Sequence, residues 1–496
     1  MRHRPQRCTG RRLGHRAGVA VAMAALCLVP TTVGCSSPTV LAGRPSSMLY
    51  DPNRVGGLPA AGGFTGRRPE AGQPSGTVEG GDGSDDDRLA LLAVNDIQDF
   101  WTATYPQYFS GEYRPITAIR SYDSRTPSSL GACGGRNGYK SVNASYCRLD
   151  DSIAWDRGVL IPLTRQYFGD IAVAGTLAHE LGHAVQTRAH SVHFFNHTLT
   201  KEQQADCFAG VYLHWVAEGH SSRFAMNTTD GLDRVLAGGI TLRDPTDEPE
   251  FGHGAHGSAL DRIGAFQEGF NGDPAVCAAI DHKEIDRRHV GLPPALQNYS
   301  ADDSAAGEMS IDEHSLELLM ETLTAIFHPD KPPALVVGGT AGCSDARPSP
   351  PASYCPTTNT IDVDLPGLRA IGAYTDRESH QLLQGDDTAF SVATSRYVLA
   401  VQRQQGVALT GERAALRTAC LTGVAQRSMA TPIAVPSGSN LTLNAGDLDE
   451  AISGLLTNHL VASDVNGDSV PAGFTRITAF RSGLVGNAAQ CYGNFP

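Results

Sequence analysis

The sequence predicts an α+β fold that occurs twice, once in each half of the chain. Apolar residues recur at helical spacing around "GTLAHELGHAVQ" (175–186) and around "TKEQQADCFAG" (200–210), which predicts two helices. The short apolar segment "SIAWD" (152–156) indicates a β-strand. Finally, four cysteines and their neighbours recur about two hundred positions later. The fold class rests on these three observations.

Length and composition limit the kinds of protein that fit. A chain of 496 residues exceeds the size at which one hydrophobic core stops growing, so we expect two domains. Hydrophobic residues make up 41% and charged residues 18%, which excludes a wholly disordered chain and a polytopic membrane protein. The net charge is -13, although residues 1–34 contain six arginines and no acidic residue. This acidic balance excludes nucleic acid as the main partner.

The beginning of the chain predicts export. Arginines precede the apolar run "AGVAVAMAALCLV" (17–29), which is too short to span a bilayer comfortably, so residues 1–34 are predicted to be a signal peptide. The next residues, "TVGC", are similar to a bacterial lipobox, whose cysteine is acylated, although Thr32 stands where leucine is usual. We therefore expect an envelope protein anchored to the membrane through Cys35. Ordinary signal cleavage and secretion is the alternative.

The helix around "AHELGHAVQ" carries a metal-binding pattern. His179 and His183 are four residues apart, so both imidazoles lie on one helix face and can share a zinc ion, with Glu180 beside them. Gly182 is unusual in a helix interior, and close packing of another segment against it would explain its presence. The alternative is a pair of histidines that are buried in the core or exposed to solvent.

The next helix offers the missing ligand. Thr200 and Gln203 fit a capping box at its start, and Glu202 and Asp206 share a face. Glu202 would complete a set of two histidines and one glutamate, which leaves a fourth position open. Asp206 would accept a hydrogen bond from a ligand imidazole and so orient it. Cys207 points about 140° away from Glu202 around the helix, so we expect a disulfide there.

The repeated cysteines predict a duplication. "DRIGAFQEGFNGDPAVC" (261–277) and "TRITAFRSGLVGNAAQC" (475–491) share eight identical residues at an offset of 214, and each half also contains "ASYC". Pairs that both copies inherit must be the same in each copy. The predicted disulfides are Cys133–Cys147, Cys207–Cys277, Cys343–Cys355 and Cys420–Cys491.

HExxH followed by Glu-x-x-Ala-Asp resembles the neutral zinc metallopeptidase family, a gluzincin-like group, over most of residues 88–280. With its stalk and Cys35, the chain resembles a mycobacterial lipoprotein peptidase. The resemblance implies a zincin-like fold, zinc held by His179, His183 and Glu202, and Glu180 as general base. It also implies a peptide or protein substrate. Ala184 departs from the family, whose members often have a further histidine there.

The sequence offers more than one candidate for the residue that stabilises the oxyanion of the reaction. His256, in "GHGAHGS", corresponds to a His-Gly-Ser/Thr stretch of the family and is the candidate, with His253 and Tyr212 as rivals. A loop histidine bonded to the backbone is the alternative. "SIAWD" is predicted to be an edge strand along which an extended peptide substrate pairs.

The second half retains none of the ligands. Matching "AVQ" at 184–186 with "AVQ" at 400–402, and "ADCFAG" with "TACLTG", places other residues at every ligand position. We therefore expect a degenerate domain with a structural or recognition role, such as binding a protein partner. The residues that replace His179, Glu180, His183, Glu202 and Asp206 are Ser395, Arg396, Leu399, Ala415 and Ala419.

These inferences predict both the organisation of the chain and its function. The function is zinc-dependent hydrolysis of peptide bonds at the cell envelope. The alternative is a non-catalytic envelope-binding lipoprotein whose zinc site serves stability, but a structural site would close its fourth position with a protein ligand. The Gly-, Pro- and Asp-rich composition of residues 35–87 predicts a flexible linker. The predicted segments are a signal peptide (1–34), a flexible linker (35–87), a zinc metallopeptidase domain (88–285), a second linker (286–300) and a degenerate metallopeptidase-like domain (301–496).

Overall fold

The structure is a computed structural model. It describes residues 50–127, 129–131, 133, 137–193, 196–241, 257–289, 308–339, 342–375, 382–443 and 446–496. The predicted signal peptide, Cys35, His253 and His256 therefore lie outside the described residues. Within the described ranges, no helix combines the length and apolar character needed to cross a membrane.

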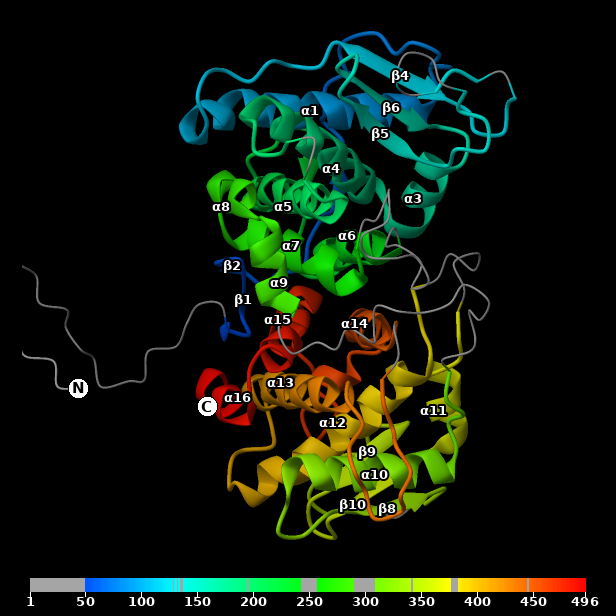
Figure 1. Cartoon of the computed structure of the whole chain (residues 1–496), viewed down its shortest axis with the longest axis vertical. Coiled ribbons are helices and arrows are strands. Elements are labelled where there is room, and N and C mark those ends of the chain that lie inside the picture. Colours follow the sequence, from blue (N-terminus) through cyan, green and yellow to red (C-terminus); the bar gives the residue numbers. More distant parts are fainter. Residues whose placement is uncertain are drawn as a thin grey trace, which may run out of the picture. The chain divides into compact units, whose positions relative to one another are not determined.

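The first half combines small sheets with a set of helices, in agreement with the predicted α+β class (Figure 1). Its strands are β1 (Arg54–Val55), β2 (Leu58–Pro59), β3 (Gly66–Arg67), β4 (Ala118–Tyr122), β5 (Ala144–Cys147), β6 (Ser152–Asp156) and β7 (Phe224–Ala225). Its helices are α1 (Asp85–Tyr108), α3 (Leu160–Phe168), α4 (Asp170–Ala189), α5 (Thr198–Ala217), α6 (Asp230–Thr241), α7 (Ala259–Asn271), α8 (Pro274–Ala279) and α9 (His282–His289).

The strand predicted at 152–156 exists, but it is not an edge strand. This strand, β6, is the middle strand of a three-stranded sheet, with β4 parallel on one side and β5 antiparallel on the other. All five of its residues are buried. The continuous apolar run of "SIAWD" is typical of a strand covered on both sides. The edge next to α4 belongs to β5 instead.

Helix α1 is joined to this sheet by a buried carboxylate. Ser84 caps the helix by accepting a hydrogen bond from the backbone N–H of Asp87 at 3.2 Å. The Asp87 carboxylate in turn accepts from the Ser121 hydroxyl at 2.6 Å and from the Trp155 indole at 2.9 Å. Both donors come from strands, so the start of α1 is fixed against β4 and β6.

The two helices predicted to carry the metal-binding pattern pack directly against each other. A Cβ atom at Gly182 would lie 2.9 Å from the carbonyl oxygen of Ala205 on α5. This contact confirms the close packing expected at Gly182. Figure 1 shows α4 between the β4–β6–β5 sheet and α5. Helix α5 begins at Thr198 rather than at the predicted capping box, and no side chain caps it.

Residues 50–84 differ from the flexible linker expected there. Strand β3 pairs with β7, and the Thr228 hydroxyl accepts from the backbone N–H of Ala61 at 3.0 Å. The Asn227 amide donates to the Gly63 carbonyl oxygen at 2.7 Å. A segment with few apolar residues is thus held by backbone hydrogen bonds to a distant segment, which composition does not reveal. Similarly, the second predicted linker begins inside α9, which ends at His289.

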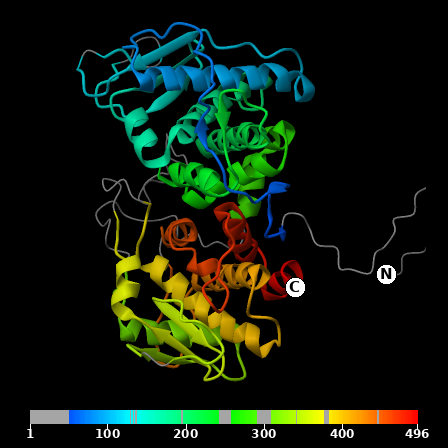
Figure 2. The ribbon, with the colours of Figure 1, turned by 180° about the vertical axis from the view of Figure 1, so that it is seen from behind.

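The second half repeats the order of elements found in the first. A helix precedes three strands, a short helix follows, and longer helices complete the half, as Figure 2 shows from behind. Strand β10 pairs with β8 in parallel and with β9 in antiparallel orientation, as β6 does with β4 and β5. The elements are α10 (Glu313–Phe327), β8 (Ala334–Val337), β9 (Ala352–Cys355), β10 (Thr360–Val363), α11 (Leu365–Ile371), α12 (Asp386–Gln404), α13 (Glu412–Met429), α14 (Asp447–Thr457), η4 (Leu460–Ala462), α15 (Gly473–Leu484) and α16 (Ala488–Asn494).

Corresponding helix pairs cross in the same way in both halves. A Cβ atom at Gly269 on α7 would lie 1.8 Å from the carbonyl oxygen of Cys207 on α5. At the repeated position, a Cβ atom at Gly483 on α15 would lie 1.8 Å from the carbonyl oxygen of Cys420 on α13. The backbones touch at these glycines. The structure forms the four disulfides that the duplication predicts, Cys133–Cys147, Cys207–Cys277, Cys343–Cys355 and Cys420–Cys491.

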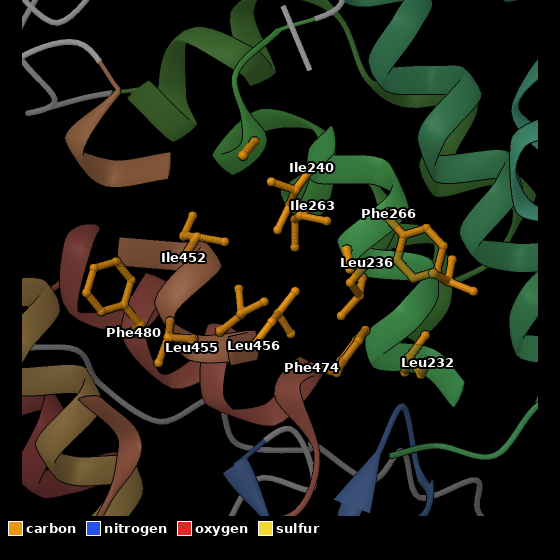
Figure 3. Packing of buried hydrophobic residues seen from close by; sticks show 14 of the residues in the cluster. Leu232, Leu236, Ile240, Ile263, Phe266, Ile452, Leu455, Leu456, Phe474 and Phe480 are labelled. Carbon is orange, nitrogen blue, oxygen red and sulfur yellow. The ribbon is translucent and has the colours of Figure 1, made fainter. Parts of the chain in front are cut away.

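The two halves share an apolar interface formed by α6 and α7 on one side and by α14 and α15 on the other. The aromatic rings of Phe270 and Phe474 lie 5.1 Å apart across it. Apolar side chains dominate this interface, and an ion pair between Arg476 and Asp233 and helix caps add to it. Figure 3 shows Leu232, Leu236, Ile240, Ile263 and Phe266 facing Ile452, Leu455, Leu456 and Phe474.

We expect alanine at Gly269 or Gly483 to separate the crossed helices, because the new methyl group would overlap a backbone carbonyl. Overpacking of this kind costs about 1–3 kcal/mol or more, so both variants should unfold at clearly lower temperature than the wild type. Gly239→Ala on α6 is the matched control, since its Cβ would be 3.8 Å from the nearest atom, Cδ1 of Ile263 on α7. Calorimetry showing a wild-type melting temperature for Gly269→Ala would contradict the close crossing.

Candidate metal centre

Helices α4 and α5 bring the three predicted ligands together. His179 and His183 project from α4 towards Glu202 on α5. The Nε2 atoms of the two imidazoles lie 3.1 Å and 3.5 Å from the same carboxylate oxygen, Oε2 of Glu202. One ligand atom from each residue lies within 4.8 Å of the others. The contact between Gly182 and Ala205 makes this possible, because it lets the helices approach at their backbones.

The other ring nitrogen of each imidazole, Nδ1, also has a hydrogen-bond partner. His179 Nδ1 lies 2.7 Å from Oδ1 of Asp206, and His183 Nδ1 lies 3.0 Å from Oε1 of Gln186. Both partner atoms are acceptors, so each ring donates from Nδ1 and directs Nε2 towards Glu202. The sequence predicted Asp206 in this position but not Gln186, although Gln186 follows His183 by three residues on the same helix.

Arg262 is a further member of the centre that the sequence analysis did not assign. Its guanidinium donates two hydrogen bonds to Asp206, Nε to Oδ2 at 3.0 Å and Nη2 to Oδ1 at 2.8 Å. Arg262 lies on the first turn of α7 and is buried. Arg262 is one of the eight residues that recur at an offset of 214, where its counterpart is Arg476.

The electrostatic environment favours positive charge at the centre of this group. Burial by itself lowers the pKa of His179, but Asp206, Glu202 and Glu180 outweigh it and raise that pKa to about 10. Burial would raise the pKa of Glu202, but the two histidines hold it well below its ordinary value. The pKa of Asp206 is likewise lowered despite burial, by Arg262 and His179. The carboxylates are therefore ionised and available to a cation.

Glu180, which follows His179 on α4, contacts the neighbouring sheet. Its Oε2 accepts a hydrogen bond from the backbone N–H of Tyr146 at 2.9 Å. Tyr146 lies on β5, the edge strand that packs on α4. This bond orients the carboxylate.

The donor set fits zinc. Two imidazole nitrogens and one carboxylate oxygen form a ligand set that zinc uses in catalytic sites, where the fourth position is left to water or substrate. Cys207 is bonded to Cys277, which agrees with its predicted exclusion as a ligand. Tyr212, a rival for the oxyanion role, instead donates its hydroxyl to the buried Asp96 at 2.8 Å. His256, the first candidate for that role, lies outside the described residues.

The residues of the second half that the sequence match aligns with the ligands have other partners. Arg396, aligned with Glu180, is fully buried. Its guanidinium donates to the Ser349 hydroxyl at 3.1 Å and to the Leu460 carbonyl oxygen at 2.6 Å, and burial lowers its pKa to about 10. Ser395 and Leu399, aligned with the two histidines, are buried as well.

Two other groups of potential ligands occur among the described residues. Cys343 and Cys355 are bonded to each other, so neither is free to bind a metal beside Asp345. The second group consists of the carboxyl groups of Glu308, Asp386 and Glu450. Burial and the neighbouring carboxylates raise the pKa of Asp386 to about 7 and raise that of Glu450 well above its ordinary value. A metal ligand must be deprotonated, so these shifts disfavour a cation at neutral pH.

Comparison with known proteins agrees with this geometry. The family described as "Putative neutral zinc metallopeptidase" matches residues 51–280, which include α4, α5, the sheet and both disulfides of the first half. No curated protein and no solved structure matches the chain. Residues 51–280, which contain the His179–His183–Glu202 group, are thus similar to the neutral zinc metallopeptidase family.

Proposed function

We propose that the protein is a zinc-dependent peptidase whose centre is formed by His179, His183 and Glu202. One observation carries the proposal: three donors of the kind that zinc uses converge from two helices, with each imidazole held at its other nitrogen. The match of residues 51–280 to a family of zinc metallopeptidases supports the same reaction class. A zinc ion held there would polarise the scissile carbonyl and lower the pKa of water to about 7.

Glu180 is proposed as the general base. It follows His179 directly, and its carboxylate is oriented by the backbone N–H of Tyr146. From this position it takes a proton from the attacking water and passes it to the leaving amine. An extended peptide substrate is proposed to lie along β5, because β5 is the edge strand of its sheet and packs beside α4.

The second half is proposed to be a degenerate copy of the first. Four observations support this origin: the repeated sequence, the same strand pairing in the two sheets, the two corresponding disulfides and the same glycine crossings. Arg396 occupies the place of the general base, so the copy has lost the chemistry. We propose that it supports the first half and offers a surface to a protein partner.

The protein is proposed to act outside the cytoplasm, held at the membrane through an acylated Cys35. The arginine-rich start and the apolar run before Cys35 support export. The four disulfides support an oxidising compartment, because such bonds persist mainly outside the cytoplasm.

The chemical proposal predicts different losses for the base and for the ligands. Glu180→Gln keeps an acceptor for the Tyr146 N–H but has no basicity, so it should retain zinc and lose peptide hydrolysis by a factor of about 10² or more. His179→Ala, His183→Ala and Glu202→Ala should each lose the single zinc of the chain. Elemental analysis and cleavage of a peptide library, followed by mass spectrometry, measure both effects.

The outcome also separates the enzyme from a binding lipoprotein that keeps zinc for stability. Wild-type hydrolysis by Glu180→Gln would show that the assigned base is wrong. A wild-type protein that holds zinc but cleaves no member of the library would favour the binding protein. Two zinc ions per chain would contradict the loss of ligands from the second half.

The anchoring proposal predicts that removing the Cys35 thiol changes the cell fraction in which the protein is found. Cys35→Ser should move the protein from the membrane fraction to the soluble extracytoplasmic fraction in a host that processes lipoproteins, because the thiol that carries the lipid is absent. Cys27→Ser, within the predicted signal peptide, is the matched control and should leave the protein with the membrane. Retention of Cys35→Ser in the membrane fraction would exclude this anchor.

A further inference from the structure

The two halves cap each other's helices at their interface. Asp449, on α14 of the second half, accepts hydrogen bonds from the backbone N–H groups of Ala259 at 3.0 Å and Leu260 at 3.3 Å. These are the first two residues of α7 in the first half. In the other direction, Asp233 on α6 accepts from the backbone N–H of Gly473 at 2.8 Å, which is the first residue of α15.

The arrangement has the reciprocity of a symmetric dimer within one chain. Ala259 and Gly473 are repeated positions, since they differ by the offset of 214 that relates the two cysteine-rich segments. Gln267 and Arg481 differ by the same offset, and Arg481 donates to Oε1 of Gln267 at 2.6 Å. Each copy thus presents the same face to the other, as in an isologous interface.

The arginines on the first turns of the two capped helices have different hydrogen-bond partners. The first turn of α7 carries Arg262, whose guanidinium is bonded to Asp206, and Asp206 is bonded to Nδ1 of His179. The first turn of α15 carries Arg476, whose guanidinium returns to Asp233 at 3.1 Å and to backbone carbonyls. One cap is therefore connected to the metal centre, and the other is connected only to the interface.

We propose that Asp449 is a positioning residue for the metal centre, supplied by the degenerate half. Its carboxylate holds the first turn of α7, which places Arg262 against Asp206 and thereby fixes the orientation of His179. This inference rests on the proposed zinc site. It assigns the second half a role in that site, because a residue of the second half positions a helix of the first, as a second subunit can in a dimer.

The physical basis is the start of α7. The first N–H groups of a helix have no partner inside the helix, and an ionised carboxylate there is also favoured by the helix dipole. Ser258 supplies one cap from within the segment, through its hydroxyl and the N–H of Asp261. Asp449 binds the two N–H groups that this cap leaves, so α7 depends on the second half at the turn that carries Arg262.

The test compares Asp449→Ala with Asp233→Ala in the full-length chain. Both remove a cap across the same interface, but only the first is connected to His179. We expect Asp449→Ala to release zinc to a chelator about 10-fold faster than the wild type, as loss of outer partners of a ligand histidine does. Asp449→Asn, which retains an acceptor oxygen, should restore most of the difference. Asp233→Ala should lower the melting temperature and leave zinc release unchanged.

A second measurement does not depend on metal. Hydrogen exchange in residues 257–263 should become faster in Asp449→Ala but not in Asp233→Ala. Combining Asp449→Ala with Arg262→Ala should add little to the faster zinc release of Arg262→Ala alone, because both act through the same turn. Equal zinc release by Asp449→Ala and Asp233→Ala, or unchanged exchange in residues 257–263, would overturn the inference. A wild-type chain that binds no zinc would instead overturn the proposed function, while the exchange measurement still decides whether Asp449 caps α7.

Discussion

The contact on which the site depends is the backbone approach of α4 and α5 at Gly182. With no side chain at this position, the helix can meet the carbonyl oxygen of Ala205, and Glu202 then lies opposite both histidines. A side chain of any size would push α5 away and separate the carboxylate from the imidazoles. Glycine costs helix stability, about 1 kcal/mol relative to alanine, which the packing of the two helices offsets.

Near this contact, buried charged side chains are linked by consecutive hydrogen bonds. Arg262 holds Asp206, Asp206 holds His179, and His179 faces Glu202. All of these side chains are largely buried, and each needs its neighbour, since a buried charge without a partner is costly. The orientation of the ligand ring is thus decided by residues on a third helix, α7, and not by the ligand helices alone.

The second half has a similar helix crossing with a different set of buried polar side chains. Helices α13 and α15 touch at Gly483 and are followed by the Cys420–Cys491 disulfide, as α5 and α7 touch at Gly269 beside Cys207–Cys277. On α12, the buried Arg396 donates to backbone carbonyl oxygens. The two halves associate through α6, α7, α14 and α15.

The sequence by itself determined the two helices that carry His179, His183 and Glu202 and the four cysteine pairs, because helical spacing and repeated cysteine positions can be recognised along the chain. Only the tertiary structure decided that "SIAWD" is a central strand, since β4 and β5 come from separate segments. It also decided that residues 50–84 are held by β7 and its neighbours, and that Arg262 belongs to the centre. These features depend on contacts between segments far apart in the chain, where each hydrogen-bond partner is set by packing and no local pattern records it.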